Sequence, residues 1–316
     1  MHATASLIFG LILTAGASFS ADWPRFRGPD GNGISKETAW FKEWPATGPK
    51  VFWEAKVGLG FSAFAVAEGK ALITGNEADT DTLFCFDAVT GKELWKRSYP
   101  CPLLPKYYQG GTNATPTIEA GRVYHLGKMG QMFCLNLADG SVIWEKDIVK
   151  EHGLTVPEWG FAGSPVILGD LIFLNAGGAG LTLKKTDGSL AWKSDTSSAA
   201  YASVLPIELN GVPSLAILSH RDLVAVNLAD GKEWWRHPFK SGYDTNAMDP
   251  IPWNGHLIVS AHDQKAELIN ISSAEPKLVG TLGDTRIHMN SGVVIGDPTF
   301  GKGTVQTLVD LNRLTR

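Results

Sequence analysis

The chain has 316 residues, and 44% of them are apolar, which is enough to build a large buried core. The formal net charge is only −4, and no run of Lys and Arg is present, so the composition argues against nucleic-acid binding. The 35 glycines and 11 tryptophans are typical of a turn-rich, all-β chain.

Residues 1–20 have the features of a secretory signal peptide. The run ASLIFGLILTAGA is apolar, and the small residues Ala17 and Ser20 each suit a cleavage site. The run is short for a bilayer span, and a buried N-terminal strand is the alternative. No Cys follows the run. We therefore expect a periplasmic or secreted protein with neither a membrane span nor a lipid anchor.

Residues 21–50 are predicted to form an irregular N-terminal arm. The segments DWPRFRGPDGNGIS and WFKEWPATGPK are rich in Pro, Gly and aromatic residues, and neither shows a strand period. Four aromatic side chains are expected to pack the arm on the rest of the molecule, namely Trp23, Phe26, Trp40 and Trp44.

Residues 51–316 contain a repeat that ends on a tryptophan. The copies are FCFDAVTGKELW to Trp95, FCLNLADGSVIW to Trp144, LTLKKTDGSLAW to Trp192 and LVAVNLADGKEWW to Trp235. Counted from Trp53, the steps are 42, 49, 48 and 43 residues. A period in the forties that carries strands predicts an all-β fold, a β-propeller with one four-stranded antiparallel blade per repeat. We expect the tryptophans to bridge neighbouring blades; a ligand-stacking platform is the alternative.

Each repeat carries two turn signals. The first is a tight turn before an apolar strand, with Gly69, Gly121, Gly169, Gly211 and Gly255. The second is the D-x-x-T-G turn before the tryptophan, with Gly91, Gly140, Gly188 and Gly231 in the left-handed conformation. In that turn Asp87 or Asn136 is expected to accept backbone N–H groups.

The repeat degrades toward the C-terminus. AELINISSAEPKLVG keeps Asn270 but has lost the Gly and the Trp, and the sixth unit, which begins at NSGVVIGD, fails to repeat. We therefore expect a propeller domain over 51–316 that is truncated before the outer strand of a sixth blade. The segment around Trp53 then resembles a closing strand for a missing blade. Such a chain, expressed alone, is expected to aggregate or to exchange strands.

The three cysteines are predicted to be unpaired. Cys85 and Cys134 occupy the same repeat position, so we expect small core residues rather than a disulfide. Cys101 is expected to be a loop thiol without a partner. No Cys and His cluster has the spacing of a zinc site, and no metal ligand is predicted.

The segments that lead into the innermost strands are the candidate ligand site. They bring Asn113, Trp159, Tyr201, Asn246 and Asn290 to roughly equivalent positions at one mouth of the channel. Amides and aromatic rings together suit a neutral polar ligand such as a sugar, or a peptide edge. The alternative is that these side chains satisfy buried turns.

No catalytic residue is predicted. GFAGSPV lacks the G-x-S-x-G pattern of a nucleophile elbow. Glu151 and Glu158 flank one loop and could form a glycosidase pair, but two solvated glutamates are the simpler interpretation.

The repeat resembles the pyrroloquinoline-quinone (PQQ) type propeller repeat of quinoprotein alcohol dehydrogenases and of outer-membrane protein assembly factor B. The motif WPRFRGPDGNG resembles the start of secreted PQQ-like propellers of planctomycetes and verrucomicrobia, and the match runs from Trp23 to about Asp297. The resemblance implies a parent ring of about seven or eight blades. It also implies quinone and Ca²⁺ held by carboxylates, an Asp base and a Cys-Cys lid. This sequence has no Cys-Cys pair and no acidic cluster in those segments, so no cofactor is predicted.

Together these features favour a non-catalytic, secreted propeller that binds a ligand or a protein partner in the cell envelope, with a possible link to polysaccharide handling. The first alternative is a PQQ-dependent dehydrogenase, or a relic of one, with PQQ and calcium as cofactors. The second is an outer-membrane assembly factor, against which the missing lipid-anchor Cys argues.

Overall fold

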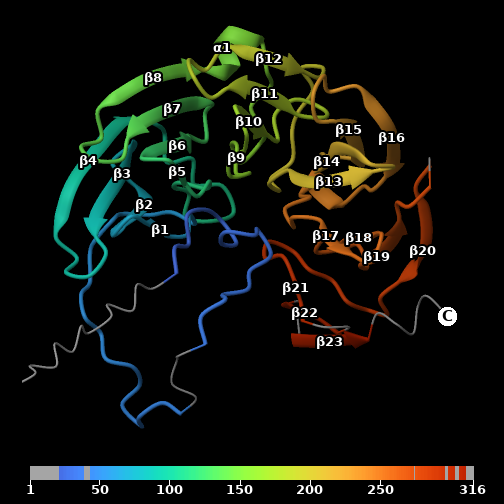
Figure 1. Ribbon diagram of the computed structural model, residues 1–316, viewed down its shortest axis with the longest axis horizontal. Helices are drawn as coiled ribbons and strands as arrows, with labels where there is room; N and C mark the ends of the chain where they lie inside the picture. The colour runs from blue at the N-terminus through green and yellow to red at the C-terminus, as the bar shows by residue number, and fades with distance from the viewer. Residues whose placement is uncertain (1–20, 39–42, 274, 296–297, 303–305, 311–316) are drawn as a thin grey trace, which may run out of the picture.

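Apolar strands bounded by tight turns form six antiparallel sheets that follow one another along the chain. The computed structural model describes residues 21–38, 43–273, 275–295, 298–302 and 306–310, so the predicted signal peptide and Trp40 lie outside the described residues. Figure 1 shows the sheets arranged around a centre, with the first strand of each sheet inside and the last outside.

Five sheets have four strands and the sixth has three described strands. In chain order they are β1 (Ala65–Ala67), β2 (Lys70–Glu77), β3 (Thr80–Asp87), β4 (Glu93–Pro100); β5 (Thr117–Glu119), β6 (Arg122–Leu126), β7 (Gln131–Asn136), β8 (Val142–Asp147); β9 (Val166–Leu168), β10 (Leu171–Leu174), β11 (Leu181–Lys184), β12 (Leu190–Lys193); β13 (Leu205–Leu209), β14 (Val212–Leu218), β15 (Asp222–Asn227), β16 (Glu233–Pro238); β17 (Ile251–Trp253), β18 (His256–Val259), β19 (Glu267–Asn270), β20 (Lys277–Thr281); β21 (Val293–Val294), β22 (Pro298–Lys302), β23 (Gln306–Asp310). The short helices are α1 (Ile148–His152) and η1 (Gly242–Asp244). The prediction of an all-β propeller with four-stranded antiparallel blades is confirmed.

The repeat tryptophans join neighbouring blades. Each lies on an outer strand or its equivalent and donates its indole N–H to a carbonyl in the second turn of the next blade. The bonds are Trp53 to Ala88 O at 3.2 Å, Trp95 to Leu137 O at 3.0 Å, Trp144 to Lys185 O at 3.1 Å and Trp192 to Leu228 O at 3.0 Å. The prediction that these rings connect the blades is confirmed.

The contact with the tryptophan ring requires glycine in the second turn. Gly188 has φ +71°, and a Cβ placed there would lie 2.8 Å from the Trp144 ring. Gly91, Gly140 and Gly231 also have positive φ and face Trp53, Trp95 and Trp192 in the same way. Only glycine combines the left-handed backbone with this close approach, and the Gly-to-Trp spacing of the repeat follows from it.

The segment before the first blade and the turn of the fifth depart from this scheme. Residues 51–58 form no strand, although Trp53 makes the contact of an outer-strand tryptophan. At the other end, Trp235 is buried, but its indole nitrogen has no hydrogen-bond partner among the described residues. In the other blades the acceptor is a carbonyl in the second turn of the next blade. For Trp235 that turn belongs to the degenerate fifth unit, which still forms a four-stranded sheet.

The cysteines are free and buried. Cys85 and Cys134 lie in the apolar clusters between blades, as predicted. The expectation for Cys101 is wrong in part, because this residue follows β4 in a loop but is only 1% exposed and its thiol bonds the carboxylate of Asp81.

The arm is tied to the ring by its first residues. Trp23 exchanges two backbone hydrogen bonds with Val66 of β1, at 2.6 and 2.8 Å. Trp44 is 60% exposed, so the prediction that it packs the arm on the propeller is wrong.

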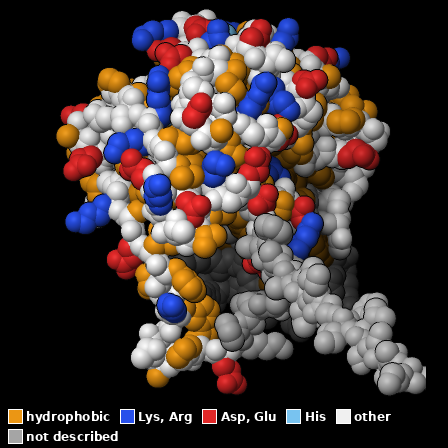
Figure 2. Space-filling model, turned by 60° about the vertical axis from the view of Figure 1, so that its left-hand side comes forward, with side chains coloured by type: hydrophobic (Ala, Val, Ile, Leu, Met, Phe, Trp, Pro, Cys, Tyr) orange, Lys and Arg blue, Asp and Glu red, His pale blue; other side chains and the backbone are white. Residues whose placement is uncertain are grey.

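Charged side chains of both signs are interspersed on the face seen in Figure 2, with no continuous field of one sign. Within the described part of the chain, no helix is both long and apolar enough to cross a membrane.

Candidate binding site at the channel mouth

A relay of hydrogen bonds runs around the inner rim of the ring. Two residues before each innermost strand, a backbone N–H donates to the side chain at the same position of the next blade. The links are Ala63 N to Thr115 Oγ1 (2.9 Å), Thr115 N to Ser164 Oγ (3.0 Å), Ser164 N to Ser203 Oγ (3.1 Å), Ser203 N to Asp249 Oδ1 (2.6 Å) and Asp249 N to Ser291 Oγ (2.8 Å). These bonds satisfy buried backbone donors and set the spacing of the segments at the mouth.

The sequence analysis missed this relay. In the sequence, the relay residue is a Ser, Thr or Asp. It is followed by one residue, Pro, Val or Gly, and then by the innermost strand, as in NATPT, AGSPV and AMDPI. Measured against the relay, the five predicted site residues are not equivalent. Asn113 and Tyr201 lie two residues upstream of it, whereas Trp159 lies five, Asn246 three and Asn290 one. The expectation of equivalent positions is therefore wrong.

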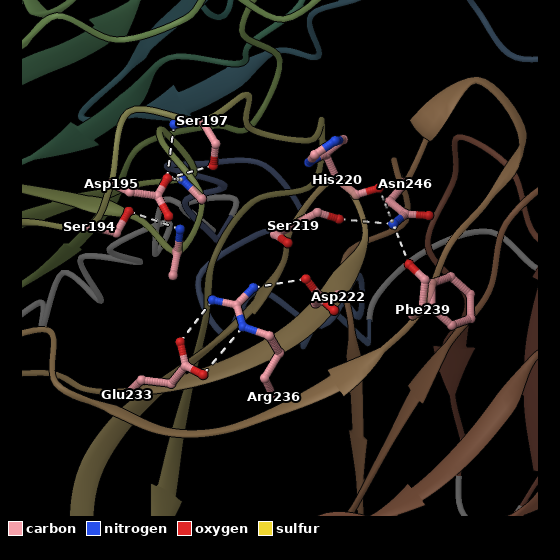
Figure 3. A network of polar contacts seen from close by, with 12 residues as sticks. Ser194, Asp195, Ser197, Ser219, His220, Asp222, Glu233, Arg236, Phe239 and Asn246 are labelled. Carbon is pink, nitrogen blue, oxygen red and sulfur yellow. Dashed lines mark hydrogen bonds and ion pairs between the residues drawn. The ribbon is translucent and has the colours of Figure 1, made fainter.

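The side-chain amides of Asn113 and Asn246 hold the loops together. Asn113 donates to Trp159 O at 2.8 Å. Asn246 is fully buried and donates to Ser219 O at 2.8 Å and Phe239 O at 3.0 Å (Figure 3). Because these N–H groups are used by the protein itself, the alternative that such side chains satisfy buried turns holds for both residues.

Trp159 and Tyr201 form the part of the predicted site that faces solvent. Their ring centroids are 5.8 Å apart with an interplanar angle of 62°, and both side chains are partly exposed. The backbone N–H of Tyr201 donates to Asn246 O at 3.0 Å, which fixes Tyr201 on the buried amide below it. Burial raises the pKa of Tyr201 to about 12, so its hydroxyl is neutral at neutral pH and can donate a hydrogen bond.

Three further aromatic residues lie on segments that are connected to this pair. The indole of Trp159 donates to Lys106 O at 3.2 Å, which brings the 106–108 loop against it. The ring centroids of Tyr108 and Phe61 are 5.6 Å apart. The Tyr108 hydroxyl also contributes to the raised pKa of Tyr201. Phe61 is 58% exposed and Tyr107 is 92% exposed. We call Phe61, Tyr107, Tyr108, Trp159 and Tyr201 the aromatic mouth.

Asn290 does not join this group. It is exposed, in the loop before β21, and no contact between described residues links it to the other four predicted residues. The rim near it carries histidines instead, with the His262 and His288 rings 4.8 Å apart. The mouth is therefore aromatic on the side of blades two to four and polar on the side of blades five and six.

The glutamates considered for glycosidase chemistry are separated into different ion pairs. Glu158 pairs with Lys106, and Glu151 lies 3.6 Å from Lys146 at α1. Neither carboxylate faces the other as a catalytic pair requires. The thiols are equally unsuited to nucleophilic chemistry, because burial raises the pKa of Cys85 and of Cys101 to about 12.

The blades match a known family of propeller sequences. The family model described as outer membrane protein assembly factor BamB, which is built on the PQQ-like repeat, matches residues 37–145 and 106–297. The chain belongs to this family. No curated protein matches its sequence significantly.

Solved structures of PQQ-like propellers share the fold. BamB from Moraxella catarrhalis is 16% identical, with a TM-score of 0.44 over 80% of this chain and 84% of that one. Quinohemoprotein alcohol dehydrogenase ADHIIG from Pseudomonas putida HK5 is 12% identical, with a TM-score of 0.53 over 79% of this chain and 52% of that one. The quinohemoprotein alcohol dehydrogenase of Comamonas testosteroni is 14% identical, with a TM-score of 0.52 over 81% and 47%. This PQQ-like chain thus spans about half the length of the two dehydrogenases.

A small cavity lies at the inner rim of the ring. Arg25 of the arm, Ser164, Ser203 and Asp249 line a cavity of about 40 Å³ there. That volume has room for one or two water molecules. Among the described residues, no group of three or more His, Cys, Asp or Glu side chains is arranged to hold a metal ion.

Proposed function

We propose that this PQQ-like propeller is a non-catalytic, secreted binding protein of the cell envelope, and that it binds a neutral saccharide at the aromatic mouth. The observation that carries the proposal is the partly exposed pair of Trp159 and Tyr201, with the exposed rings of Phe61 and Tyr107 on segments connected to it. Aromatic rings present flat apolar faces with a polar edge, which suits the C–H face and the hydroxyls of a sugar.

The charges around the mouth agree with a neutral ligand. The nearest charged side chains, Lys106 and Glu158, neutralise each other in an ion pair. The Tyr201 hydroxyl is uncharged at neutral pH. A charged ligand would meet no unpaired opposite charge among these groups, whereas a sugar hydroxyl could bond the Tyr201 hydroxyl.

The test is saturation-transfer NMR with neutral hexasaccharides of glucose, xylose and mannose, on wild type and on Trp159→Ala. We expect at least one saccharide to give a signal that Trp159→Ala weakens at least about tenfold in affinity, as for a central aromatic contact. Trp234→Ala is the matched control, because Trp234 is a 43% exposed tryptophan on β16. Equal binding by Trp159→Ala and wild type, or no saccharide signal at all, would contradict the proposal.

Family membership favours a second candidate, a protein-interaction scaffold or assembly factor. The same exposed rings would then receive a segment of a partner protein. This candidate predicts no saccharide signal, but a protein partner whose affinity falls in Trp159→Ala and not in Trp234→Ala. No described residue specifically favours the dehydrogenase alternative.

A further inference from the structure

The first part of the N-terminal arm lies at the centre of the ring (Figure 1). Figure 1 shows the start of the described chain beside the innermost strands. Trp23 pairs with Val66 of β1, and Ile118 of β5 donates its backbone N–H to Pro24 O at 2.7 Å. We call residues 23–33 the arm loop. Its first two residues thus bind the first two blades directly.

Arg27 binds the other end of the arm loop to the sixth sheet. Its Nε donates to Gly31 O at 2.9 Å and its Nη2 to Asn32 O at 3.1 Å, which folds the loop on itself. The same Nη2 donates to Gly292 O at 2.9 Å, directly before β21. A single guanidinium therefore joins the arm loop to a segment 265 residues away. Its planar array of donors suits this use better than a lysine ammonium.

Packing and charge support the same connection. A Cβ placed on Gly33 would lie 3.2 Å from a methyl carbon of Val293, so the arm loop lies close against β21. Arg25 and Asp249 line one cavity, and both Arg25 and Arg27 interact electrostatically with Asp249. Asp249 is the carboxylate in a relay whose other acceptors are hydroxyl groups.

We propose that the arm loop is an internal clamp, which fills the channel and holds the sixth sheet against the first two blades through Arg27. The clamp contacts β1, β5 and the segment before β21, so it bridges the two sides of the ring that no strand pairing joins among the described residues. One consequence is that a ligand of this protein binds at the rim and does not pass into the channel. The clamp does not depend on what the aromatic mouth binds.

Hydrogen exchange of the full chain, read by mass spectrometry, tests the clamp. In Arg27→Gln we expect the amides of 291–294 and of 23–33 to exchange about tenfold faster or more, because the bond to Gly292 is lost. The strands of the third and fourth blades, such as 212–218, should keep their wild-type protection. Arg221→Gln is the control, since Arg221 is a surface arginine that pairs with Asp244 instead.

Arg27→Lys keeps the charge but loses the planar array of donors, and it covers the case in which Arg27→Gln does not fold. It should also speed exchange at 291–294, though less than Arg27→Gln does. Wild-type protection of 291–294 in the folded Arg27 variants would overturn the clamp. Loss of protection in the arm loop alone would do the same, because the arm would then be a covering rather than a connection.

Discussion

The repeat tryptophan makes different contacts at different junctions between blades. The junctions after the first three blades differ from the junction after the fourth. Trp95, Trp144 and Trp192 each donate to a carbonyl of the next turn and lie against its glycine. Trp235 is just as buried, yet its indole nitrogen has no partner among the described residues. The tryptophan and the glycine turn of the following blade therefore form one unit, and a blade that loses the turn leaves its neighbour's donor unsatisfied.

The largest effect should come from filling the space of that glycine. Gly188→Ala forces a side chain onto a residue with φ +71°, with a Cβ 2.8 Å from Trp144. We expect the free energy of unfolding to fall by about 3–4 kcal/mol. Gly211→Ala is the control, since Gly211 has φ +77° but nothing within 4 Å of a Cβ, so only about 1 kcal/mol of backbone strain applies. Equal losses in urea unfolding would mean that the tryptophan contact does not set the turn.

The fourth junction also carries the carboxylate of the rim relay. Burial raises the pKa of Asp249 to about 6, against an attraction to Arg27 that lowers it. The unfolded carboxyl has a pKa near 3.9, so between about pH 4 and pH 6 the folded protein holds a proton that unfolding releases. Stability from this group therefore falls as the pH rises through that window, by at most about 3 kcal/mol. Asp249→Asn should remove this slope from unfolding curves measured between pH 4 and pH 7. An unchanged slope would assign it to other groups.

Removing the indole N–H should lower the free energy of unfolding by different amounts at the two kinds of junction, with a smaller effect than the glycine substitution. Trp192→Phe loses a hydrogen bond and leaves Leu228 O without its donor, whereas Trp235→Phe removes a donor that has no partner among the described residues. Both variants lose similar ring volume, so we expect Trp192→Phe to be less stable by about 1–2 kcal/mol relative to Trp235→Phe. Denaturant unfolding of the pair measures the difference, and a larger loss in Trp235→Phe would reverse the account of the fourth junction.

The fold was predictable from the sequence because one local unit repeats. The spacing from Gly188 to Trp192, with its copies, defines the turn and the outer strand together, and the loss of this spacing marks the degenerate fifth unit. The site was predictable only in part. Trp159 and Tyr201 were named and are partly exposed, Asn113 and Asn246 hold loops together, and Tyr107 was not singled out. The exposure of a loop residue depends on partners far away in the chain, such as Lys106 for Trp159. The local spacing of residues does not reveal these partners.

The relay and the contact of Arg27 with the sixth sheet were not predicted, for a related reason. Thr115 and Ser164 look like ordinary residues before a strand until the next blade is placed beside them. Arg27 likewise gains its role only through Gly292, 265 residues later. Contacts that close a ring join distant segments, so a reading of local turn and strand signals does not reveal them.

The central claim is that this propeller has two classes of tryptophan, structural ones between blades and a ligand-binding one at the mouth. A calorimetric titration of Trp159→Ala and Trp192→Phe with the saccharide that wild type binds tests it most directly. The account predicts that folded Trp192→Phe keeps the wild-type Kd, and that Trp159→Ala binds at least about tenfold more weakly. A Trp159→Ala variant that binds as tightly as wild type would contradict it.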